Sequence, residues 1–432
     1  MTKPTIGLQE LQAKIGHRAK SAPQHRFWGL YVHLLKPSTL EAAYLEAKRN
    51  GGAPGADGQT FEDIETRGRS DFLGKIATEL REGTYRPGPY RRREIPKAGQ
   101  SGKVRVISIP AIRDRVVQGA LRLILGPIFE ADFSDSSFGA RPGRSAHQAL
   151  AKVREGLRQR KHRVVDVDLK SFFDQLRHDR ILERVARRVM DGQVLALIKQ
   201  FLKSAGERGV PQGSPLSPLL ANVALNDLDQ KLDRGNGFLT YARYLDDMVV
   251  LVPDSEKGRR WADRALACIG REAEAVGVSI NEEKTRLVSL TDPHALFAFL
   301  GFEFRWVQSP KSGWWFPCMT PKPKKVIEVL HKIRERLRAS RHLPVRQAVA
   351  QVNPIVRGWV NYFRVGNASQ AFGKIRYHVE CKVRRFVARQ SKRAGFGWKR
   401  WSSETVYQQW GLFGDYRVGT PAAKARTGRK DP

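Results

Sequence analysis

The stretch that decides the fold runs from Tyr241 to Val252 and reads YARYLDDMVVLV. Two apolar segments flank the adjacent carboxylates Asp246 and Asp247, and this pattern predicts a β-hairpin with the aspartates at its tip. Two neighbouring negative charges are costly unless cations neutralise them. An ordinary solvated turn also favours aspartate, so the hairpin alone does not distinguish an ion site from a turn.

A second acidic strand upstream favours the ion site over the ordinary turn. Residues 164–174 read VVDVDLKSFFD and carry Asp166 and Asp168. One carboxylate from this strand, together with the hairpin pair, predicts a site for hard divalent cations. Carboxylate clusters that hold two metal ions about 4 Å apart catalyse in-line phosphoryl and nucleotidyl transfer. Nucleotidyl transfer is therefore the candidate chemistry.

The composition indicates a nucleic-acid-binding globular protein. The 432 residues suffice for two or three domains, and 41% of them are hydrophobic. Lys and Arg number 77 against 43 acidic residues, which gives a net charge of +34. A chain that is this basic and still carries clustered aspartates is most simply a nucleic-acid binder.

Several other classes of protein are disfavoured. No apolar run reaches the roughly 18 residues of a membrane span, and no amphipathic segment is both basic and free of acids. Residues 1–14 lack the apolar core of a signal peptide, so we expect a cytosolic location. The three cysteines, at positions 268, 318 and 381, are far apart and have no CxxC spacing. They predict buried thiols rather than disulfides or a zinc site.

Two segments near the N-terminus each have two interpretations. Residues 50–58, NGGAPGADG, predict a loop whose backbone amides approach another chain closely, or an ordinary surface turn. Residues 85–110 predict two strands, RRREIPK and KVRVISIP, joined by a glycine-containing turn. This basic ribbon is either a solvated edge or a clamp for triphosphates or a nucleic-acid backbone.

The order of the remaining elements predicts an α+β protein. Residues 111–133 have the apolar spacing of a core helix. Strand, helix, hairpin, helix and strand then follow in the order of a split βαβ sheet with helices on one face. The segment FAFLGFEFRW is predicted to be one strand.

The C-terminal part changes in character from Thr320 onward. Three amphipathic, basic helices predict a small bundle with aromatic residues in its core and basic faces toward nucleic acid. The second helix is predicted to begin at Asn353, with Pro354 in its first turn. Residues 395–432 mix tryptophans with basic residues, which suits single-strand binding or a small core with a frayed tail.

With these motifs in order, the chain resembles bacterial group II intron-encoded reverse transcriptases, also called maturases. The resemblance covers nearly the whole chain, and nine motifs in the right order are far more specific than a lone YxDD. They are NGGAPGADG, the IPK…R…IP hairpin, SSFGARPGRSAH, DLKSFFD, VPQGSPLSPLLAN, YLDD, INEEKT, FLGFEF and NPIVRGWVNYF.

The resemblance implies a right-hand polymerase with fingers, a split-βαβ palm and a basic three-helix thumb, the maturase domain X. Residues 1–65 would form an N-terminal extension with the template-contacting loop, and residues 66–305 the fingers and palm. Residues 306–390 would form the thumb. Residues 391–432 would form a basic nucleic-acid-binding region whose end we expect to be disordered.

The resemblance also implies roles for individual residues. Asp168, Asp246 and Asp247 correspond to the catalytic trio that binds two Mg²⁺ ions. Asp168 is preferred to Asp166 because the family places an aromatic residue five positions after its first catalytic aspartate, and Phe173 stands there. Phe173 then matches the steric gate against a ribose 2′-hydroxyl.

Further residues match substrate-binding positions of the family. Lys97 and Arg105 match the residues that grip the incoming triphosphate, and Lys284 matches the lysine near the leaving pyrophosphate. Gln212 and Gly213 match the loop that packs against the nascent base pair. The predicted RNA-binding residues are Arg141, Arg144, Arg357, Lys382, Arg384 and Arg385.

The implied function is that of an RNA-directed DNA polymerase that binds its own group II intron RNA and promotes splicing and retromobility. Its expected partners are the intron RNA, an RNA template with a DNA primer, dNTPs and a DNA target site, with homodimer formation left open. The family's optional His-Asn-His endonuclease domain is not expected. Leu245 and Ala140 depart from the usual family residues without removing a charge.

Two alternatives remain. A splicing-only RNA-binding maturase would have an inactive polymerase, which the intact trio and triphosphate-binding residues argue against. A domesticated reverse transcriptase used in phage defence or in generating diversity is disfavoured by the maturase-type thumb.

Overall fold

The computed structural model describes residues 6–96, 104–235, 237–392, 395 and 397–419. The chain divides into two compact units, which are described separately. Unit 1 comprises residues 1–156 and 163–287, and unit 2 comprises residues 157–162 and 288–432. Lys97 lies outside the described residues. The boundaries predicted for the four regions stay predictions.

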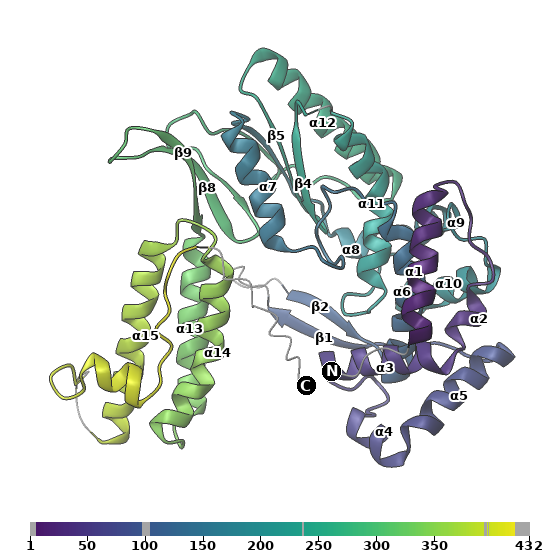
Figure 1. Ribbon diagram of the computed structural model, residues 1–432, viewed down its shortest axis with the longest axis horizontal. Coiled ribbons are helices and arrows are strands. Elements are labelled where there is room, and N and C mark those ends of the chain that lie inside the picture. Colours follow the sequence, from purple (N-terminus) through teal and green to yellow (C-terminus); the bar gives the residue numbers. More distant parts are fainter. Residues whose placement is uncertain (1–5, 97–103, 236, 393–394, 396, 420–432) are drawn as a thin grey trace, which may run out of the picture. The chain divides into compact units, whose positions relative to one another are not determined.

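The first part of unit 1 is a helical layer with a projecting ribbon (Figure 1). Helix α6 is almost wholly buried and packs against α1 and α3, and a loop at 51–59 follows α3. The two predicted strands of the basic ribbon are confirmed, since β1 pairs antiparallel with β2. The elements are α1 (Ile6–Ser21), α2 (Tyr31–Leu34), α3 (Pro37–Asn50), α4 (Phe61–Arg67), α5 (Arg69–Glu82), β1 (Arg91–Pro96), β2 (Val104–Ile109) and α6 (Ile112–Glu130).

The second part of unit 1 is built on a sheet with the order β4-β5-β3-β6. The helix α11 leads into the β4–β5 hairpin, and α12 returns the chain to β6, which confirms the predicted element order. The elements are α7 (Ala146–Arg158), β3 (Arg163–Val167), α8 (Phe172–Gln175), α9 (His178–Ala186), α10 (Gly192–Ala205), α11 (Ser217–Asp233), β4 (Thr240–Tyr244), β5 (Asp247–Val252), α12 (Glu256–Ala275) and β6 (Arg286–Ser289).

The prediction that helices cover one face of this sheet is wrong. Helix α12 contacts β3 and β5, and Val250 belongs to the same buried cluster as Ile269 of α12. Helix α7 covers the opposite face, because a Cβ on Gly156 would lie 2.9 Å from the Leu251 side chain. Adjacent strand residues such as Val250 and Leu251 point to opposite faces, and both are fully buried. The strands are therefore packed on both sides.

Unit 2 combines a small sheet with a helical bundle. The segment predicted as one strand is instead the hairpin β7 (Phe297–Phe299) and β8 (Phe302–Gln308), continued by β9 (Trp315–Pro321). Leu300 and Gly301 have φ of +48° and +82°, and two successive positive φ values characterise type I′ turns. The alternating apolar residues continue through this turn, which is why the sequence reads as one strand.

The predicted three-helix bundle is confirmed, with α13 (Pro323–Ala339), α14 (Val345–Phe363) and α15 (Ser369–Gln390) in mutual contact. The predicted start of the second helix is wrong, because Pro354 lies inside α14. Asn353 instead uses its side chain to hold the returning C-terminal segment. Its Nδ2 donates to the Gly411 carbonyl at 2.8 Å, and its Oδ1 accepts from the Phe413 N–H at 2.9 Å.

No helix in the described ranges is long and apolar enough to cross a bilayer. The three cysteines carry free thiols, of which Cys381 is buried and the other two are half-buried.

Candidate active site

Residues 241–252 form the predicted hairpin. Strand β4 pairs with β5 up to Tyr244 opposite Asp247, so Leu245 and Asp246 are the two turn residues. Leu245 has a φ of +60°, and a positive φ at the first turn residue is typical of the type II′ turns that close hairpins. A leucine in this region is strained by about 1 kcal/mol or more. The surrounding contacts must therefore hold the tip in place.

The pairing of β3 with β5 brings the third aspartate to this hairpin. The last paired residues are Val167 and Met248. One step further along these antiparallel strands come Asp168 and Asp247. Directly opposed residues of antiparallel strands have Cα atoms about 4.5–5.5 Å apart. The register therefore places the backbone of Asp168 beside the first residue of β5.

Asp168 is held by two side chains from the segment before β6. Lys284 Nζ lies 3.1 Å from Asp168 Oδ2, and Asn281 Nδ2 donates to the same oxygen at 2.9 Å. Lys284 lies in a turn, because β6 begins only at Arg286. Both members of the ion pair are close to half exposed, so it contributes about 0–1 kcal/mol. Lys284 thus provides a weakly held positive charge beside Asp168.

The electrostatic environment of Asp246 links these groups. The pKa of its carboxyl group is raised, chiefly because burial disfavours the charged form. The negative charge of Asp168 raises this pKa further, and the positive charge of Arg105 lowers it. Asp168 and Arg105 therefore both lie within electrostatic range of the hairpin tip. A bound cation would remove the cost of ionising Asp246.

The three aspartates fit a divalent ion in their chemistry. All of their donor atoms are carboxylate oxygens, which Mg²⁺ prefers. Within the part of the chain that the structure describes, no three His, Cys, Asp or Glu side chains are already gathered as a ligand set. Asp168 Oδ2 accepts hydrogen bonds from Asn281 and Lys284. Burial and the negative charge of Asp168 raise the pKa of Asp246, and a divalent ion would offset both effects.

A buried polar network positions the hairpin. Arg243 and Asp229 form a fully buried ion pair. Arg243 also donates to Asn222 Oδ1 at 3.0 Å and to the Leu245 carbonyl at 2.9 Å, and the Tyr241 hydroxyl donates to Asp229 at 2.8 Å. Removing one partner of a buried ion pair costs about 3–5 kcal/mol. The Arg243 side chain thus links the strained turn to helix α11.

A second backbone segment packs against the same turn. The Phe138 N–H donates to the Arg243 carbonyl at 2.9 Å, and Asn222 Nδ2 donates to the Gly139 carbonyl at 2.9 Å. A Cβ on Gly139 would lie 2.5 Å from the Leu245 backbone nitrogen. Only glycine therefore allows this approach to the hairpin tip.

The loop before α11 is fixed to the basic ribbon. The Ser108 N–H donates to the Gln212 carbonyl at 2.7 Å. Gly213 has a φ of +115°, and a Cβ there would lie 2.8 Å from the Ser108 carbonyl oxygen. The predicted base-pair loop is thus joined to the strand that carries Arg105 by a backbone hydrogen bond and by a close approach that needs glycine at position 213.

Phe173 is half-buried in the short helix α8, next to Phe172 at a ring-centroid distance of 5.2 Å. Its carbonyl accepts a hydrogen bond from the Val210 N–H at 2.7 Å, which ties α8 to the same loop.

Comparison with known proteins identifies the family. Residues 95–304 match the family described as reverse transcriptase (RNA-dependent DNA polymerase), and residues 326–404 match the group II intron maturase-specific domain. Protein YkfC of Escherichia coli K12 is 32% identical over 342 residues, which cover 68% of this chain and 87% of YkfC. The chain belongs to the group II intron-encoded reverse transcriptases.

Two further comparisons show lower similarity to this reverse transcriptase. The group II intron-encoded protein LtrA of Lactococcus lactis is 27% identical over 373 residues, which cover 70% of this chain but only 60% of LtrA. A solved telomerase of Candida albicans covers 76% of this chain and 66% of its own, at 14% identity and a TM-score of 0.39.

Family membership confirms the predicted fold class and type of reaction. The reverse transcriptase has the right-hand polymerase fold followed by a maturase-type thumb region. Its reaction is RNA-directed DNA synthesis.

Two of the predicted RNA-binding arginines of this reverse transcriptase require correction. Arg141 is buried, ion-paired with Glu130 at 2.7 Å and bonded to the Ser137 carbonyl at 2.6 Å. Arg384 is 1% exposed, ion-paired with Glu380 at 2.6 Å, and its guanidinium lies 4.3 Å from the Trp398 ring centroid. Both guanidinium groups are engaged inside the protein, which argues against the predicted RNA contacts at these two positions.

The other four predicted positions are more accessible. Arg144 is partly exposed and ion-paired with Asp135, and the exposed Arg357 lies over the Phe413 ring at 5.8 Å. Lys382 and Arg385 line a groove in unit 2. Their role in RNA binding stays a prediction.

The sequence interpretation missed the residues that position the site. Arg243 lies within the decisive stretch, and an arginine inside an otherwise apolar strand signals a buried ionic partner, because an unpaired buried charge is very costly. The identity of that partner, Asp229, has no such signal. Asn281 was likewise visible only as part of the INEEKT motif.

Proposed function

We propose that this reverse transcriptase extends a DNA primer on an RNA template with two Mg²⁺ ions held by Asp168, Asp246 and Asp247. The observation that carries the proposal is the β3–β5 register, which brings Asp168 beside the YLDD hairpin. The ions would activate the primer 3′-hydroxyl and neutralise the triphosphate and the departing pyrophosphate.

The residues of the chain position the substrates around that site. Arg105 would hold the triphosphate, since a guanidinium group matches phosphate oxygens well, and Lys97 would join it. Lys284 would leave Asp168 and balance the charge of the pyrophosphate. Phe173 would exclude a 2′-hydroxyl, while the loop at 212–213 would pack on the nascent pair. Positioning and electrostatics supply most of the rate in such a reaction.

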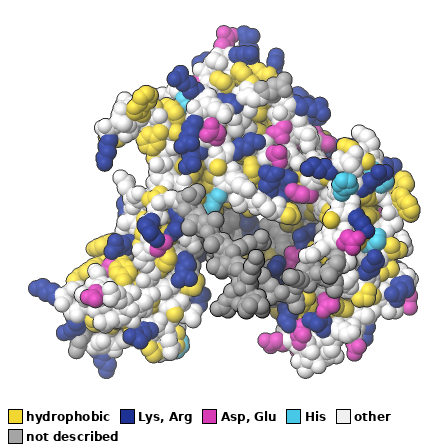
Figure 2. Space-filling view, viewed as in Figure 1, with side chains coloured by type: hydrophobic (Ala, Val, Ile, Leu, Met, Phe, Trp, Pro, Cys, Tyr) yellow, Lys and Arg dark blue, Asp and Glu magenta, His cyan; other side chains and the backbone are white. Residues whose placement is uncertain are grey.

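We also propose that the protein binds group II intron RNA, promotes its splicing and carries it to a DNA target site. The match of residues 326–404 to the maturase-specific domain and the net charge of +34 support this. Figure 2 shows Lys and Arg side chains spread over the face drawn, with fewer acidic side chains among them. The proposed location is the bacterial cytoplasm, at the nucleoid when DNA is bound. A measurement of the protein's mass in solution tests whether it forms a homodimer.

Primer extension on an RNA template tests the polymerase proposal. The wild type should give full-length DNA, and Asp246→Ala should give almost none, because one ion ligand is lost. Asp174→Asn is a matched control, since this exposed aspartate belongs to α8 outside the trio. Full-length product from Asp246→Ala would contradict the assignment. Splicing of the intron RNA by the inactive variant would separate maturase function from polymerase function.

A further inference from the structure

Unit 2 contains a strongly basic groove between α13 and α15, here called the α13–α15 groove. Its volume is about 850 Å³, and none of its nine lining residues is acidic. Leu337 and Phe386 contribute an apolar floor, and Gln390 closes one end. The six cations that line it are Arg334, Arg338, Arg341, Lys382, Arg385 and Arg389.

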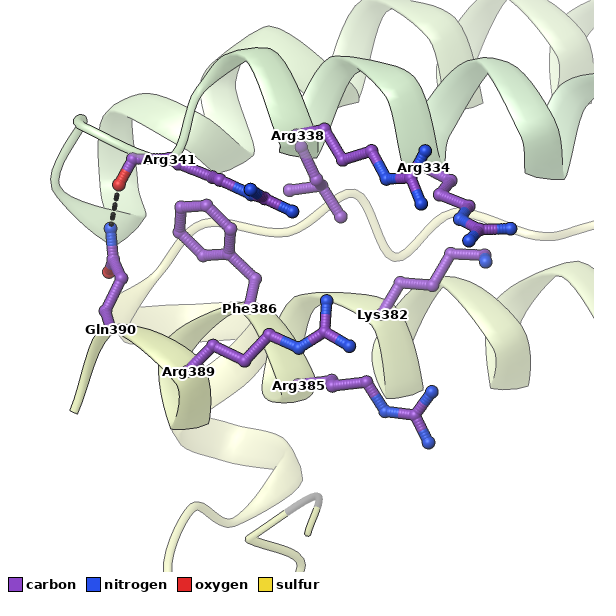
Figure 3. A pocket seen from close by; sticks show the side chains of 9 residues that line it. Arg334, Arg338, Arg341, Lys382, Arg385, Phe386, Arg389 and Gln390 are labelled. Carbon is purple, nitrogen blue, oxygen red and sulfur yellow. Dashed lines mark hydrogen bonds between the residues drawn. The ribbon is translucent and has the colours of Figure 1, made fainter. Parts of the chain in front are cut away.

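The cations form two rows that face each other across the groove (Figure 3). One row comes from α13 and from Arg341, two residues beyond the end of α13, and the other comes from α15. Gln390 Nε2 donates to the Arg341 carbonyl at 3.1 Å, which fixes the C-terminal ends of the rows together. Each row spans seven residue steps, or about 10 Å at the helical rise.

No acidic side chain accompanies the six cations in the lining of the groove. The pKa of Lys382 is lowered by burial first, and then by the charges of Arg334, Arg385 and Arg338. Cations favour the last turn of a helix because they offset its dipole. The helix dipole accounts for two of the lining cations, Arg338 and Arg389, which lie in the last turns of α13 and α15. The mutual repulsion of the clustered cations favours an anion in the groove.

We propose that the α13–α15 groove binds the phosphodiester backbone of a single nucleic-acid strand. This inference rests on the proposed nucleic-acid-binding function and adds to it a site and a strand type. A row of about 10 Å faces about three phosphates at the ~3.4 Å axial spacing of a stacked strand.

The spacing expected for two helices in contact, such as α13 and α15, favours a single strand. Packed helices have axes about 8–10 Å apart, so the space between their side chains is narrower than a double helix. A duplex would contact only the outer ends of the side chains, whereas a single strand can enter between the rows. Leu337 and Phe386 on the floor offer apolar contact to sugars or bases.

The salt dependence of binding tests this inference directly. The triple variant Arg334→Gln, Arg338→Gln and Arg385→Gln removes three cations from both rows. Since log K falls with log salt by about 0.7 per phosphate contact on a single strand, the slope for a single-stranded RNA oligonucleotide should decrease by about 2. Fluorescence anisotropy over a range of salt concentrations measures that slope.

A matched control keeps the same loss of net charge. Lys324→Gln, Arg336→Gln and Lys374→Gln remove three exposed cations from the same two helices outside the groove, and should change the slope far less. Thermal melting of both triple variants checks that the bundle is folded. Equal slopes for the two variants, or a loss on duplex RNA as large as that on the single strand, would overturn the inference.

Two further arms identify the strand and separate the proposals. A decrease on single-stranded RNA and DNA alike supports binding through the backbone of either strand, and a decrease on RNA alone supports the groove as an RNA site. Asp246→Ala, which should not extend primers, should keep the wild-type slope. If the wild type itself fails to extend a primer while the slope depends on the groove, only the polymerase proposal fails.

Discussion

Arg243 is the side chain on which the position of the hairpin depends most. Arg243→Met should lower the free energy of unfolding by about 3–5 kcal/mol, because Asp229 is left as an unpaired buried charge. Adding Asp229→Leu should recover much of that loss, since both charges are then absent. Urea unfolding of the three proteins measures the difference. A double variant less stable than Arg243→Met would show that the ion pair is not the main interaction.

Asp246 should destabilise the ion-free protein at neutral pH. Its pKa is raised in the folded state, so the folded protein binds this proton more tightly than the unfolded chain does. That contribution to stability is present below the unfolded pKa and is lost as the pH rises through the folded pKa. Asp246→Asn should therefore raise the Tm by about 1–3 °C at neutral pH, with no gain in acid below the ordinary aspartate pKa.

Added Mg²⁺ should act against this difference in Tm between the wild type and Asp246→Asn. An ion that binds only the folded state stabilises it, so Mg²⁺ should raise the Tm of the wild type more than that of Asp246→Asn. Differential scanning calorimetry with and without Mg²⁺ measures both effects. An equal response of the two proteins to Mg²⁺ would argue against Asp246 as a ligand.

Among the elements, the contact between the Gln212–Gly213 loop and β2 is the most sensitive to a small change. Gly213→Ala combines a φ of +115° with a Cβ at 2.8 Å from a carbonyl oxygen. The substitution should displace β2 and raise the KM for dNTPs several-fold, at a stability cost of about 1–3 kcal/mol. Gly74→Ala, in an exposed turn of α5 with no atom within 4 Å of its Cβ, should instead add about 0.5–1 kcal/mol.

Steady-state kinetics and thermal melting of the two glycine variants compare these outcomes. An unchanged KM for dNTPs in Gly213→Ala would separate this loop from nucleotide binding.

Elements with strong local signals were predictable, and those decided by distant partners were not. The YLDD hairpin and the bundle helices follow from apolar periodicity and turn residues. The start of α14 was missed because Asn353 and Pro354 have the pattern of a helix start. The Asn353 side chain instead bonds the backbone of residues 411 and 413, which the local sequence does not reveal. The β7–β8 turn was missed because Leu300 adopts a positive φ that leucine rarely shows.

At the scale of the whole molecule, charge predicts the class of ligand but not the residues that contact it. A net charge of +34 indicates nucleic acid. Burial then decides which arginines remain accessible: Arg141 and Arg384 are internal, whereas Arg385 reaches the α13–α15 groove. Sequence spacing cannot make this distinction, because it depends on acids and rings brought in from elsewhere, such as Glu130 and Trp398.

The most direct test of the three-aspartate site is the rate of single-nucleotide incorporation on a preformed RNA–DNA primer–template. If the aspartates act as one ion site, Asp168→Asn and Asp247→Asn should each slow this step by at least about 100-fold. Groups that act as a unit are strongly non-additive, so the double variant should be no slower than the slower single variant. A single variant with a near wild-type rate, or losses that multiply in the double variant, would contradict a shared site.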